Sequence, residues 1–478
     1  MTRKIPFILT LIVLTSGAIS FCLLTRGHSW LDDFAAYLMQ AKSILNGTMA
    51  AFVLRNAFTV NASSYPPGPV AYPWGFPLLL APLYAAFGLK ALTFKLLNTF
   101  FYALFLIVVF AFARTRLKDG EALMVTAALG FNPALLQAHD QIISDIPFLF
   151  FCTLSIWLAD KKQASLWHGL ATGAAIFAAS FIRTNGMLLL IPLALAQFFA
   201  LWPQRRFAWK QTLMPYLSFG ILYTVQALVF PNGQDSYLNH FSMFTAARLW
   251  DNFLYYLWLP AALFDGIPGG AWLYPVLLAF VAVSIWQRGK RDLPIHLFSV
   301  ATVALYIVWP ERQGLRFIYP TLPSLLIFAF DGMKLVTARL SAKWEKAPAW
   351  IMPGLWLALI TVSLGIAGNM AYANLAADRA TNGPFDPVSG EMFTFLREKT
   401  PSQSIIIFFR PRALRLFTDR DAFMTENCAD LPKGDYLALS EKVGDKGQIA
   451  PEAISQCKGV KLEQVFNNQR FTIYKIMH

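Results

Sequence analysis

The sequence predicts a polytopic α-helical membrane protein with a small α/β domain at its C-terminal end. Of its 478 residues, 56% are hydrophobic and 14% are charged, whereas soluble domains carry about 25% charged residues. Apolar stretches, many of them near the roughly 20 residues that cross a bilayer as a helix, recur as far as about residue 370. The composition after that point is that of an ordinary soluble domain.

The basic residues indicate the orientation of the chain. The formal net charge is +13, but lysine and arginine fall in short clusters between apolar stretches. This pattern follows the positive-inside rule and argues against a nucleic-acid partner. The clusters, which we place in the cytoplasm, are Arg3-Lys4, Arg114 with Arg116 and Lys118, Lys161-Lys162, Arg205-Arg206 with Lys210, Arg288 with Lys290-Arg291, and Lys334 with Arg339, Lys343 and Lys346.

About eleven transmembrane helices are expected to connect these clusters. The predicted spans cover residues 5–25, 93–113, 121–138, 146–160, 166–182, 186–202, 212–230, 271–287, 293–310, 317–333 and 350–371. This odd number puts the N-terminus in the cytoplasm and the C-terminus outside. The first stretch is similar to a signal peptide, but no small-residue cleavage site follows it, so we interpret it as a retained helix.

The first external loop, residues 26–92, is long and contains predicted helices. Helical spacing of apolar residues, with Gly47 as the expected stop, is found at Tyr37, Leu38, Ala41, Ile44 and Leu45. Residues 73–89 would invert the sidedness of every later basic cluster if they crossed the membrane. We therefore place them in the outer interface, where Pro73, Pro77 and Pro82 are more easily accommodated.

An acidic pair, Asp32-Asp33, directly follows the first apolar stretch. One of the two is explained by capping of the next helix, whose N-terminal dipole also stabilises a carboxylate. A single residue suffices for capping, so the second has no structural reason of this kind. Two adjacent carboxylates at a membrane interface also resist joint desolvation. The pair is therefore our candidate for a general base.

Four segments together resemble the GT-C glycosyltransferases, which include lipid A aminoarabinose transferases and protein O-mannosyltransferases. The first-loop signature of the family is similar to Asp33, Tyr37, Ala41 and Gly47. Its proline-rich segment is similar to Tyr65-Pro66-Pro67-Gly68 followed by Pro73-Trp74-Gly75-Phe76-Pro77. Its second external loop resembles Asn132-Pro133 through Ser144-Asp145-Ile146-Pro147, and its late basic motif resembles Glu311-Arg312 through Leu322-Pro323. The match covers most of the membrane part and is closest to bacterial relatives that use polyprenyl-phosphate sugars.

The resemblance implies an inverting glycosyltransferase of the bacterial plasma membrane. Its donor would be a polyprenyl-phosphate-linked sugar, and its acceptor a hydroxyl group of a lipid, glycan or protein on the outer face. Alignment on Tyr37 implies that Asp33 is the base, and a register shift of one residue implies Asp32. The aminoarabinose enzymes have Glu-Lys where this chain has Ser64-Tyr65, so neither a metal ligand nor a phosphate contact is carried over from that segment.

Positive charge must stabilise the departing phosphate. Arg183, Arg312 and Arg316 all lie outside in the predicted topology and are the candidates for this role. The alternative for each is an interfacial arginine that reaches lipid headgroups. For Glu311 the alternative is neutralisation of a neighbouring arginine. We expect the substrate site to be lined by Tyr37, Tyr65, Asp145 and Glu311.

A divalent cation is the one cofactor to consider, with His139, Asp140 and His240 as weak candidate ligands. A lone histidine is more often a hydrogen-bonded polar residue, and the sequence has no His-x-x-x-His or Cys-x-x-Cys motif. Cys428 and Cys457 both fall in the external tail, where an oxidising compartment favours a disulfide.

Residues 1–375 form the predicted membrane module, and residues 376–478 form the predicted external domain. Its pattern predicts a helix at 391–399 and strands at 405–409, 436–439 and 471–476. This domain is expected to position acceptor or lipid, or simply to cover the membrane module. A polytopic lipid or solute transporter is the rival interpretation of the whole chain. That class predicts inverted halves, which we do not find in the sequence.

Overall fold

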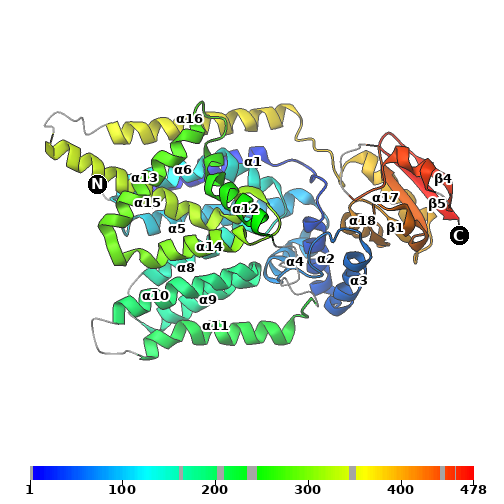
Figure 1. Cartoon of the computed structure of the whole chain (residues 1–478), viewed down its shortest axis with the longest axis horizontal. Coiled ribbons are helices and arrows are strands. Elements are labelled where there is room, and N and C mark those ends of the chain that lie inside the picture. Colours follow the sequence, from blue (N-terminus) through cyan, green and yellow to red (C-terminus); the bar gives the residue numbers. More distant parts are fainter. Residues whose placement is uncertain are drawn as a thin grey trace.

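The computed structural model describes residues 4–160, 165–201, 209–233, 245–343, 351–441, 447–457 and 459–477. Most helices form one elongated body, and a five-stranded sheet with its own helices lies at the end far from the N-terminus (Figure 1). Between the two lie α2 (Asp33–Asn46), α3 (Met49–Ala62) and α4 (Gly75–Phe87). The first external loop therefore packs against the C-terminal domain.

Helices form in each of the eleven stretches predicted as spans. They are α1 (Lys4–Leu23), α5 (Ala91–Ala113), α6 (Asp119–Gly130) with α7 (Pro133–Gln137), α8 (Asp145–Asp160), α9 (Leu166–Ile182), α10 (Leu190–Leu201), α11 (Trp209–Val229), α13 (Leu273–Arg288), α14 (Leu293–Ile307), α15 (Leu322–Lys343) and α16 (Ile351–Ala376). Within the described ranges, six helical segments are long and apolar enough to cross a membrane: those of α1, α5, α11, α13, α15 and α16. The chain thus has the character of a multi-pass membrane protein, and the count of eleven stays a prediction.

The predicted span at 121–138 is wrong as a continuous helix. Helix α6 ends at Gly130, and α7 begins at Pro133. The side chain of Asn132 accepts a hydrogen bond from the backbone N–H of Leu135 at 3.2 Å, which caps the second helix. Proline has no N–H to continue the preceding turn. This stretch therefore consists of two short helices.

Several elements lie outside the predicted spans. Helix α12 (Ala246–Trp258) is amphipathic, with Trp250 exposed and Asn252 buried. Short 3-10 helices occur at Ala138–Asp140, Thr184–Leu189, Leu259–Phe264, Gly270–Trp272, Gly289–Arg291, Gly314–Phe317, Tyr319–Thr321, Cys428–Lys433 and Pro451–Gln456. The turns at 184–189 and 314–317 adjoin two of the predicted phosphate-binding arginines: the first follows Arg183, and the second contains Arg316.

In the first external loop, the predicted stop of α2 is confirmed. Gly47 has a left-handed backbone with φ of 67°, which glycine adopts without steric cost. The predicted capping is wrong, because Asp32 occupies the N-cap position but its side chain makes no capping bond to α2. Residues 75–87 form a helix with Pro82 inside it. Their location in the membrane interface stays a prediction.

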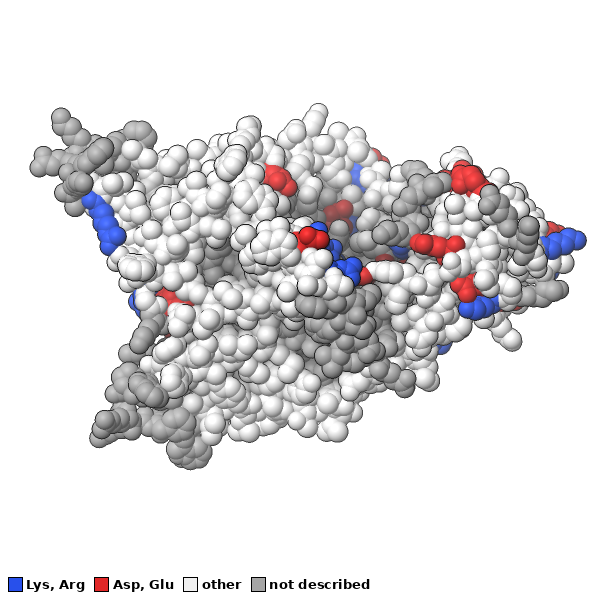
Figure 2. Space-filling view, in the orientation of Figure 1, with Lys and Arg blue, Asp and Glu red and all other residues white. Residues whose placement is uncertain are grey.

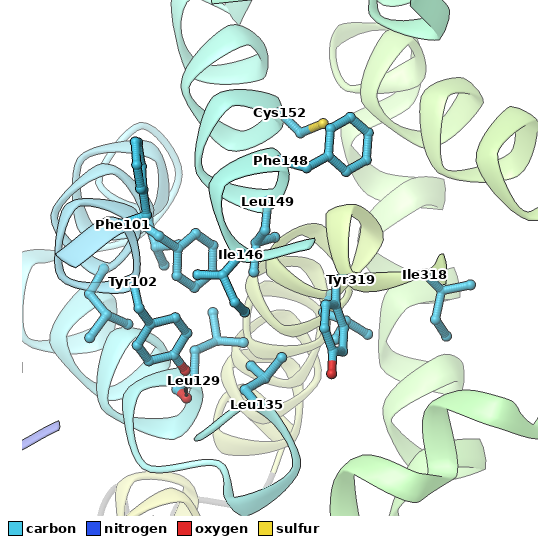
Figure 3. Packing of buried hydrophobic residues seen from close by; sticks show 14 of the residues in the cluster. Phe101, Tyr102, Leu129, Leu135, Ile146, Phe148, Leu149, Cys152, Ile318 and Tyr319 are labelled. Carbon is cyan, nitrogen blue, oxygen red and sulfur yellow. Dashed lines mark hydrogen bonds between the residues drawn. The ribbon is translucent and has the colours of Figure 1, made fainter. Parts of the chain in front are cut away.

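A cluster of buried apolar side chains fixes the start of α8 (Figure 3). Ile146 and Leu149 of this helix are buried and pack near Phe101 and Tyr102 of α5 on one side and Tyr319 on the other. The hydroxyl of Tyr102 donates to the backbone carbonyl of Leu129 at 2.6 Å, so the polar atom inside this core is satisfied. Because α8 begins at Asp145, this core also positions that carboxylate.

The C-terminal sheet has the strand order β2-β1-β3-β5-β4. Its elements are α17 (Pro387–Lys399), β1 (Ile405–Ile407), α18 (Pro411–Thr418), β2 (Asp421–Phe423), β3 (Tyr436–Ser440), β4 (Lys461–Asn467) and β5 (Phe471–Met477). Strand β1 pairs in parallel with β2 and β3, while β5 pairs antiparallel with β3 and β4. The predicted helix and all three predicted strands are confirmed as α17, β1, β3 and β5.

The predicted disulfide between Cys428 and Cys457 is also confirmed, with Cα atoms 5.3 Å apart. It joins the turn after β2 to the segment before β4. The sequence analysis missed β2, α18 and β4. Strand β2 has only three residues, and β4 is an edge strand without regular alternation of buried and exposed positions, so neither carries a strong strand pattern.

Candidate active site

A cavity of about 750 Å³ lies where the helical body meets the C-terminal domain. Its charged and tyrosine lining consists of Asp32, Asp33, Tyr37, Tyr65, Tyr72, Arg183, Tyr306, Glu311, Arg316 and Arg410. Apolar side chains from the segments around α10 and α14, such as Leu188, Ile191 and Leu305, complete the wall. On the face shown in Figure 2, charged side chains are sparse over the helical body and gather toward this junction.

Asp33 is the accessible member of the acidic pair. It occupies the first position of α2, and its side chain is 27% exposed. Its Oδ1 accepts a hydrogen bond from the Tyr72 hydroxyl at 2.6 Å, and its Oδ2 lies 3.7 Å from Nη2 of Arg316. One carboxylate oxygen is therefore fixed by a neutral donor, and the other lies beside a guanidinium.

Asp32 has a different environment. The residue is 9% exposed, and its Oδ1 accepts a hydrogen bond from the backbone N–H of Ala413 in α18 at 3.3 Å. Burial raises the pKa of Asp32 to about 6, although the nearby charges of Arg412 and Arg410 lower it. Both acids line the cavity, but Asp33 is the more exposed of the two, whereas Asp32 is buried and bonded to the C-terminal domain.

Two predicted phosphate-binding arginines share the carboxylate of Asp145. Arg183 donates to its Oδ1, and Arg316 approaches its Oδ2 at 3.2 Å. Asp145 itself is buried, with a side chain 1% exposed. Burial lowers the pKa of Arg316, but Asp145 and Asp33 outweigh burial and raise that pKa above its usual value. Both guanidiniums are held charged and face the cavity.

Tyr37 connects α2 with the segment that precedes α8. Its hydroxyl lies 3.1 Å from Oγ of Ser144, the residue before Asp145, and its ring centroid is 4.5 Å from that of Tyr72. Burial and the charge of Asp33 raise the pKa of Tyr37 above its usual range. The phenol therefore stays protonated and acts as a structural link between the acid of α2 and the start of α8.

The cavity also contains two of the remaining predicted residues. The hydroxyl of Tyr65 donates to Oε1 of Glu311, and both side chains lie at the rim. Arg312, in contrast, does not line this cavity. Its Nε donates to Oδ1 of Asn252 at 2.8 Å, and its guanidinium lies 4.9 Å from the ring centroid of Tyr255. The geometry therefore separates Arg312 from the other two arginines.

The candidate metal ligands have other partners. Nδ1 of His139 lies 2.5 Å from Oγ of Ser20, and Asp140 forms an ion pair with the buried Lys95 at 2.6 Å. His240 lies outside the described residues. Among those that are described, no group of three or more His, Cys, Asp or Glu side chains could hold a metal ion. Each acid of the cavity already has a partner: Asp33 accepts from Tyr72 and lies beside Arg316, Glu311 accepts from Tyr65, and Asp32 accepts from the backbone N–H of Ala413.

Sequence reasoning missed several residues of the site. Tyr72 stands inside the proline-rich segment that the resemblance pointed to, so its neighbourhood was a usable signal. Arg410, Met424 and Gly447 also line the cavity, although they belong to the C-terminal domain. No sequence pattern connects these positions with residues 30–70, because only folding brings the segments together.

The cavity and the helical body define the class of fold: a membrane-type helical body with an acid and arginines where it meets a C-terminal α/β domain. No protein-family model matches the chain, and no curated protein sequence matches it either. Solved structures do. ArnT from Cupriavidus metallidurans in the apo state has a TM-score of 0.63 at 13% identity and covers 97% of each chain. A second structure of that protein, bound to undecaprenyl phosphate, has a TM-score of 0.61 at 12% identity and covers 99% of this chain and 98% of that one.

Two further groups are similar. The oligosaccharyltransferase of Archaeoglobus fulgidus has a TM-score of 0.62 at 12% identity, covering 92% of this chain and 70% of that one. The mycobacterial arabinofuranosyltransferase AftD has a TM-score of 0.54 at 10% identity, covering 99% of this chain and 42% of that one. All three are GT-C glycosyltransferases. The chain therefore has the GT-C fold, as its motifs predicted.

Proposed function

We propose that this protein is an inverting glycosyltransferase that moves a sugar from a polyprenyl-phosphate donor to a hydroxyl acceptor. The observation that carries the proposal is one cavity that combines an accessible carboxylate, Asp33, with two charged guanidiniums, Arg183 and Arg316. The same cavity has an apolar wall, which suits a lipid-linked substrate. The fold supports the proposal, since its structural neighbours include an ArnT structure bound to undecaprenyl phosphate.

The proposed reaction uses Asp33 as general base. Its carboxylate accepts the proton of the acceptor hydroxyl while the hydroxyl oxygen attacks the anomeric carbon. A new carbon–oxygen bond forms on one face of the sugar as the bond to the phosphate oxygen breaks on the other. The products are the glycosylated acceptor with inverted configuration and the free polyprenyl phosphate. Arg183 and Arg316 stabilise the charge that develops on the departing phosphate.

We also propose that the site faces the outside of a bacterial plasma membrane. The basic residues Arg116 and Arg288 lie after α5 and at the end of α13, away from the cavity. The positive-inside rule places such a cluster in the cytoplasm. With Cys22 and Cys152 replaced, a cysteine introduced next to Pro401 should react with an impermeant maleimide in intact cells, whereas one next to Lys118 should react only after permeabilisation. The reverse pattern contradicts this orientation.

A transfer assay tests the activity. The purified protein is reconstituted in liposomes with undecaprenyl-phosphate sugars labelled in the sugar, and with lipid, glycan and peptide acceptors. We expect label to move from the carrier to one acceptor class, and Asp33→Asn to abolish that movement. A transporter would instead move the labelled lipid between leaflets without cleaving its sugar–phosphate bond. Flipping without transfer, or transfer that is unaffected by Asp33→Asn, would contradict the proposal.

A further inference from the structure

The first turn of α18 contains an arginine whose contacts lie outside its own domain. Arg412 is fully buried, and it is the second residue of a helix that belongs to the C-terminal domain. Its Nη1 donates to the carbonyl of Pro67 at 2.9 Å, and its Nη2 donates to the carbonyl of Pro69 at 2.5 Å. Both acceptors belong to the proline-rich segment of the first external loop.

Arg412 makes no evident contribution to the stability of the C-terminal domain itself. A cation in the first turn of a helix opposes the helix dipole, and burial of a guanidinium is costly unless it is well paired. Nε of Arg412 has no hydrogen-bond partner among the described residues. The side chain is thus an unfavourable choice for α18 alone. Its hydrogen bonds to Pro67 and Pro69 and its interaction with the carboxyl group of Asp32, all outside its own domain, offset this cost.

These contacts fix a tight turn against Tyr72. Gly68 has a φ of 123°, a conformation that residues with a side chain rarely adopt. A Cβ atom at this position would lie 2.7 Å from the hydroxyl of Tyr72 and 3.0 Å from Nη1 of Arg412. The guanidinium also lies 5.7 Å from the ring centroid of Tyr72. The turn at 67–69 is therefore held between these two side chains.

Tyr72, which contacts this turn, also binds the proposed base directly. Its hydroxyl donates to Oδ1 of Asp33 at 2.6 Å. Burial and the charge of Asp33 raise the pKa of Tyr72 well above its usual range, so the phenol stays a donor. With Oδ1 fixed in this way, Oδ2, which lies 3.7 Å from Nη2 of Arg316, is the oxygen that remains for an acceptor. The neighbouring Asp32 accepts a hydrogen bond from the backbone N–H of Ala413. Helix α18 therefore contacts Asp32 directly, and it contacts the turn beside Tyr72 through Arg412.

We propose that Arg412 is a positioning residue for Asp33, which it orients through the turn at 67–69 and through Tyr72. This inference rests on the proposed role of Asp33 as general base. It assigns the C-terminal domain a part in the reaction, because that domain supplies the group that orders the turn beside the base. Binding of the donor phosphate involves Arg183 and Arg316 and does not require Arg412.

The test combines single and double variants in the labelled-sugar transfer assay. Arg412→Met should lower kcat by about 10- to 100-fold, the usual cost of a misplaced catalytic group, while KM for the undecaprenyl-phosphate sugar stays within about twofold. Tyr72→Phe should cause a similar loss. Because both act through one contact chain, the double variant should be little worse than either alone. Arg412→Lys should recover part of the activity, since an ammonium can bind one carbonyl without the fixed fork of arginine.

Arg420→Met is the matched control. Arg420 is also a buried arginine of the C-terminal domain, with 8% exposure, but its hydrogen bonds go to Thr400, Arg397 and Thr418 within the same domain. Loss of this residue should weaken the domain and leave kcat of the folded fraction unchanged. Hydrogen exchange of a peptide covering 66–74 should accelerate in Arg412→Met and not in Arg420→Met. Formation of the disulfide between Cys428 and Cys457 reports that each variant has folded its tail.

Two results would overturn the inference while leaving the proposed function intact. One is an inactive Asp33→Asn together with full kcat in Arg412→Met. The other is a double variant in which the losses from Arg412→Met and Tyr72→Phe multiply, because independent losses exclude a shared route. An active Asp33→Asn would instead contradict the proposed function itself.

Discussion

Two networks of arginine and aspartate lie at opposite ends of the helical body and have similar composition. Near the cavity, Asp145 binds Arg183 and Arg316, and Arg316 also approaches Asp33. The distant network contains Arg116, which binds Asp160 at 2.8 Å and Asp292 at 2.5 Å, and Arg288, which binds Asp331 at 2.5 Å. Each network ties the ends of several helices together.

The difference between them is access. The side chains of Arg116 and Asp292 are fully buried, and no residue of that network lines the cavity. Asp33 and Arg316 have side chains 27% and 21% exposed, and both line the large cavity. Ion pairing alone therefore does not mark a functional site, because the same residue types are structural where substrate cannot reach them. The following predictions would break or sharpen this contrast.

The largest effect is expected for Asp33→Asn. Asparagine keeps the size of the side chain but removes the proton acceptor, so folding should survive while turnover in the transfer assay falls by about 10² to 10⁴. Asp32→Asn should reduce turnover much less, because Asp32 faces α18. Equal losses for the two variants would mean that the structure does not distinguish the acids as we infer.

A comparably large effect, on stability instead of chemistry, is expected for Arg116→Met. Removal of one partner from a buried ion pair leaves uncompensated carboxylates and costs about 3–5 kcal/mol. Thermal unfolding in detergent should therefore shift to lower temperature. The protein that remains folded should bind undecaprenyl phosphate like wild type. Weakened binding with unchanged stability would reverse the roles of the two networks.

A smaller effect is expected for Arg316→Met on donor binding. Loss of a hydrogen bond from a charged group costs about 1.5–3 kcal/mol, so the Kd for undecaprenyl phosphate should rise about 10- to 100-fold. Arg312→Met is the control, because Arg312 binds Asn252 and does not line the cavity. Titration with the lipid phosphate should give a larger Kd for Arg316→Met than for Arg312→Met, and the opposite order would contradict the assignment.

The last effect concerns the pH dependence of stability. The pKa of Asp32 is about 6 in the folded protein and 3.8 in an ordinary environment. Between these values the folded state binds more protons, so stability falls as pH rises, by at most about 1.4 kcal/mol per pH unit. The difference in unfolding temperature between wild type and Asp32→Asn should therefore decrease from pH 4 to about 6.5 and then stay constant. A difference in unfolding temperature that does not change with pH would contradict the raised pKa of Asp32.

Much of the fold could be predicted because it follows from local patterns. The apolar stretches, the stop at Gly47, the helix before Pro401 and three of five strands were all identified from spacing and composition. The failures have local causes as well. Asn132-Pro133 divides one predicted span into two helices, and the short strand β2 and the edge strand β4 lack a clear pattern.

The site was predicted in part. Asp32, Asp33, Tyr37, Tyr65, Arg183, Glu311 and Arg316 line one cavity, and Asp145 lies directly behind them. Arg312 was chosen because the predicted topology places it outside together with Arg183 and Arg316, but its side chain binds Asn252, whereas Arg316 lies beside Asp33 and Asp145. His139 and Asp140 looked like ligands, and the structure gives them Ser20 and Lys95 instead.

The sequence by itself determined where the long apolar helices form and that an acidic pair follows the first of them, because hydrophobicity and charge act residue by residue. Only the tertiary structure decided which of the two acids is the accessible one in the cavity. Asp32 and Asp33 are neighbours in the chain, but one contacts Ala413 and the other contacts Tyr72 and Arg316. Long-range packing of α18 against α2 creates this difference in desolvation and hydrogen bonding, and no local pattern encodes a contact across 380 residues.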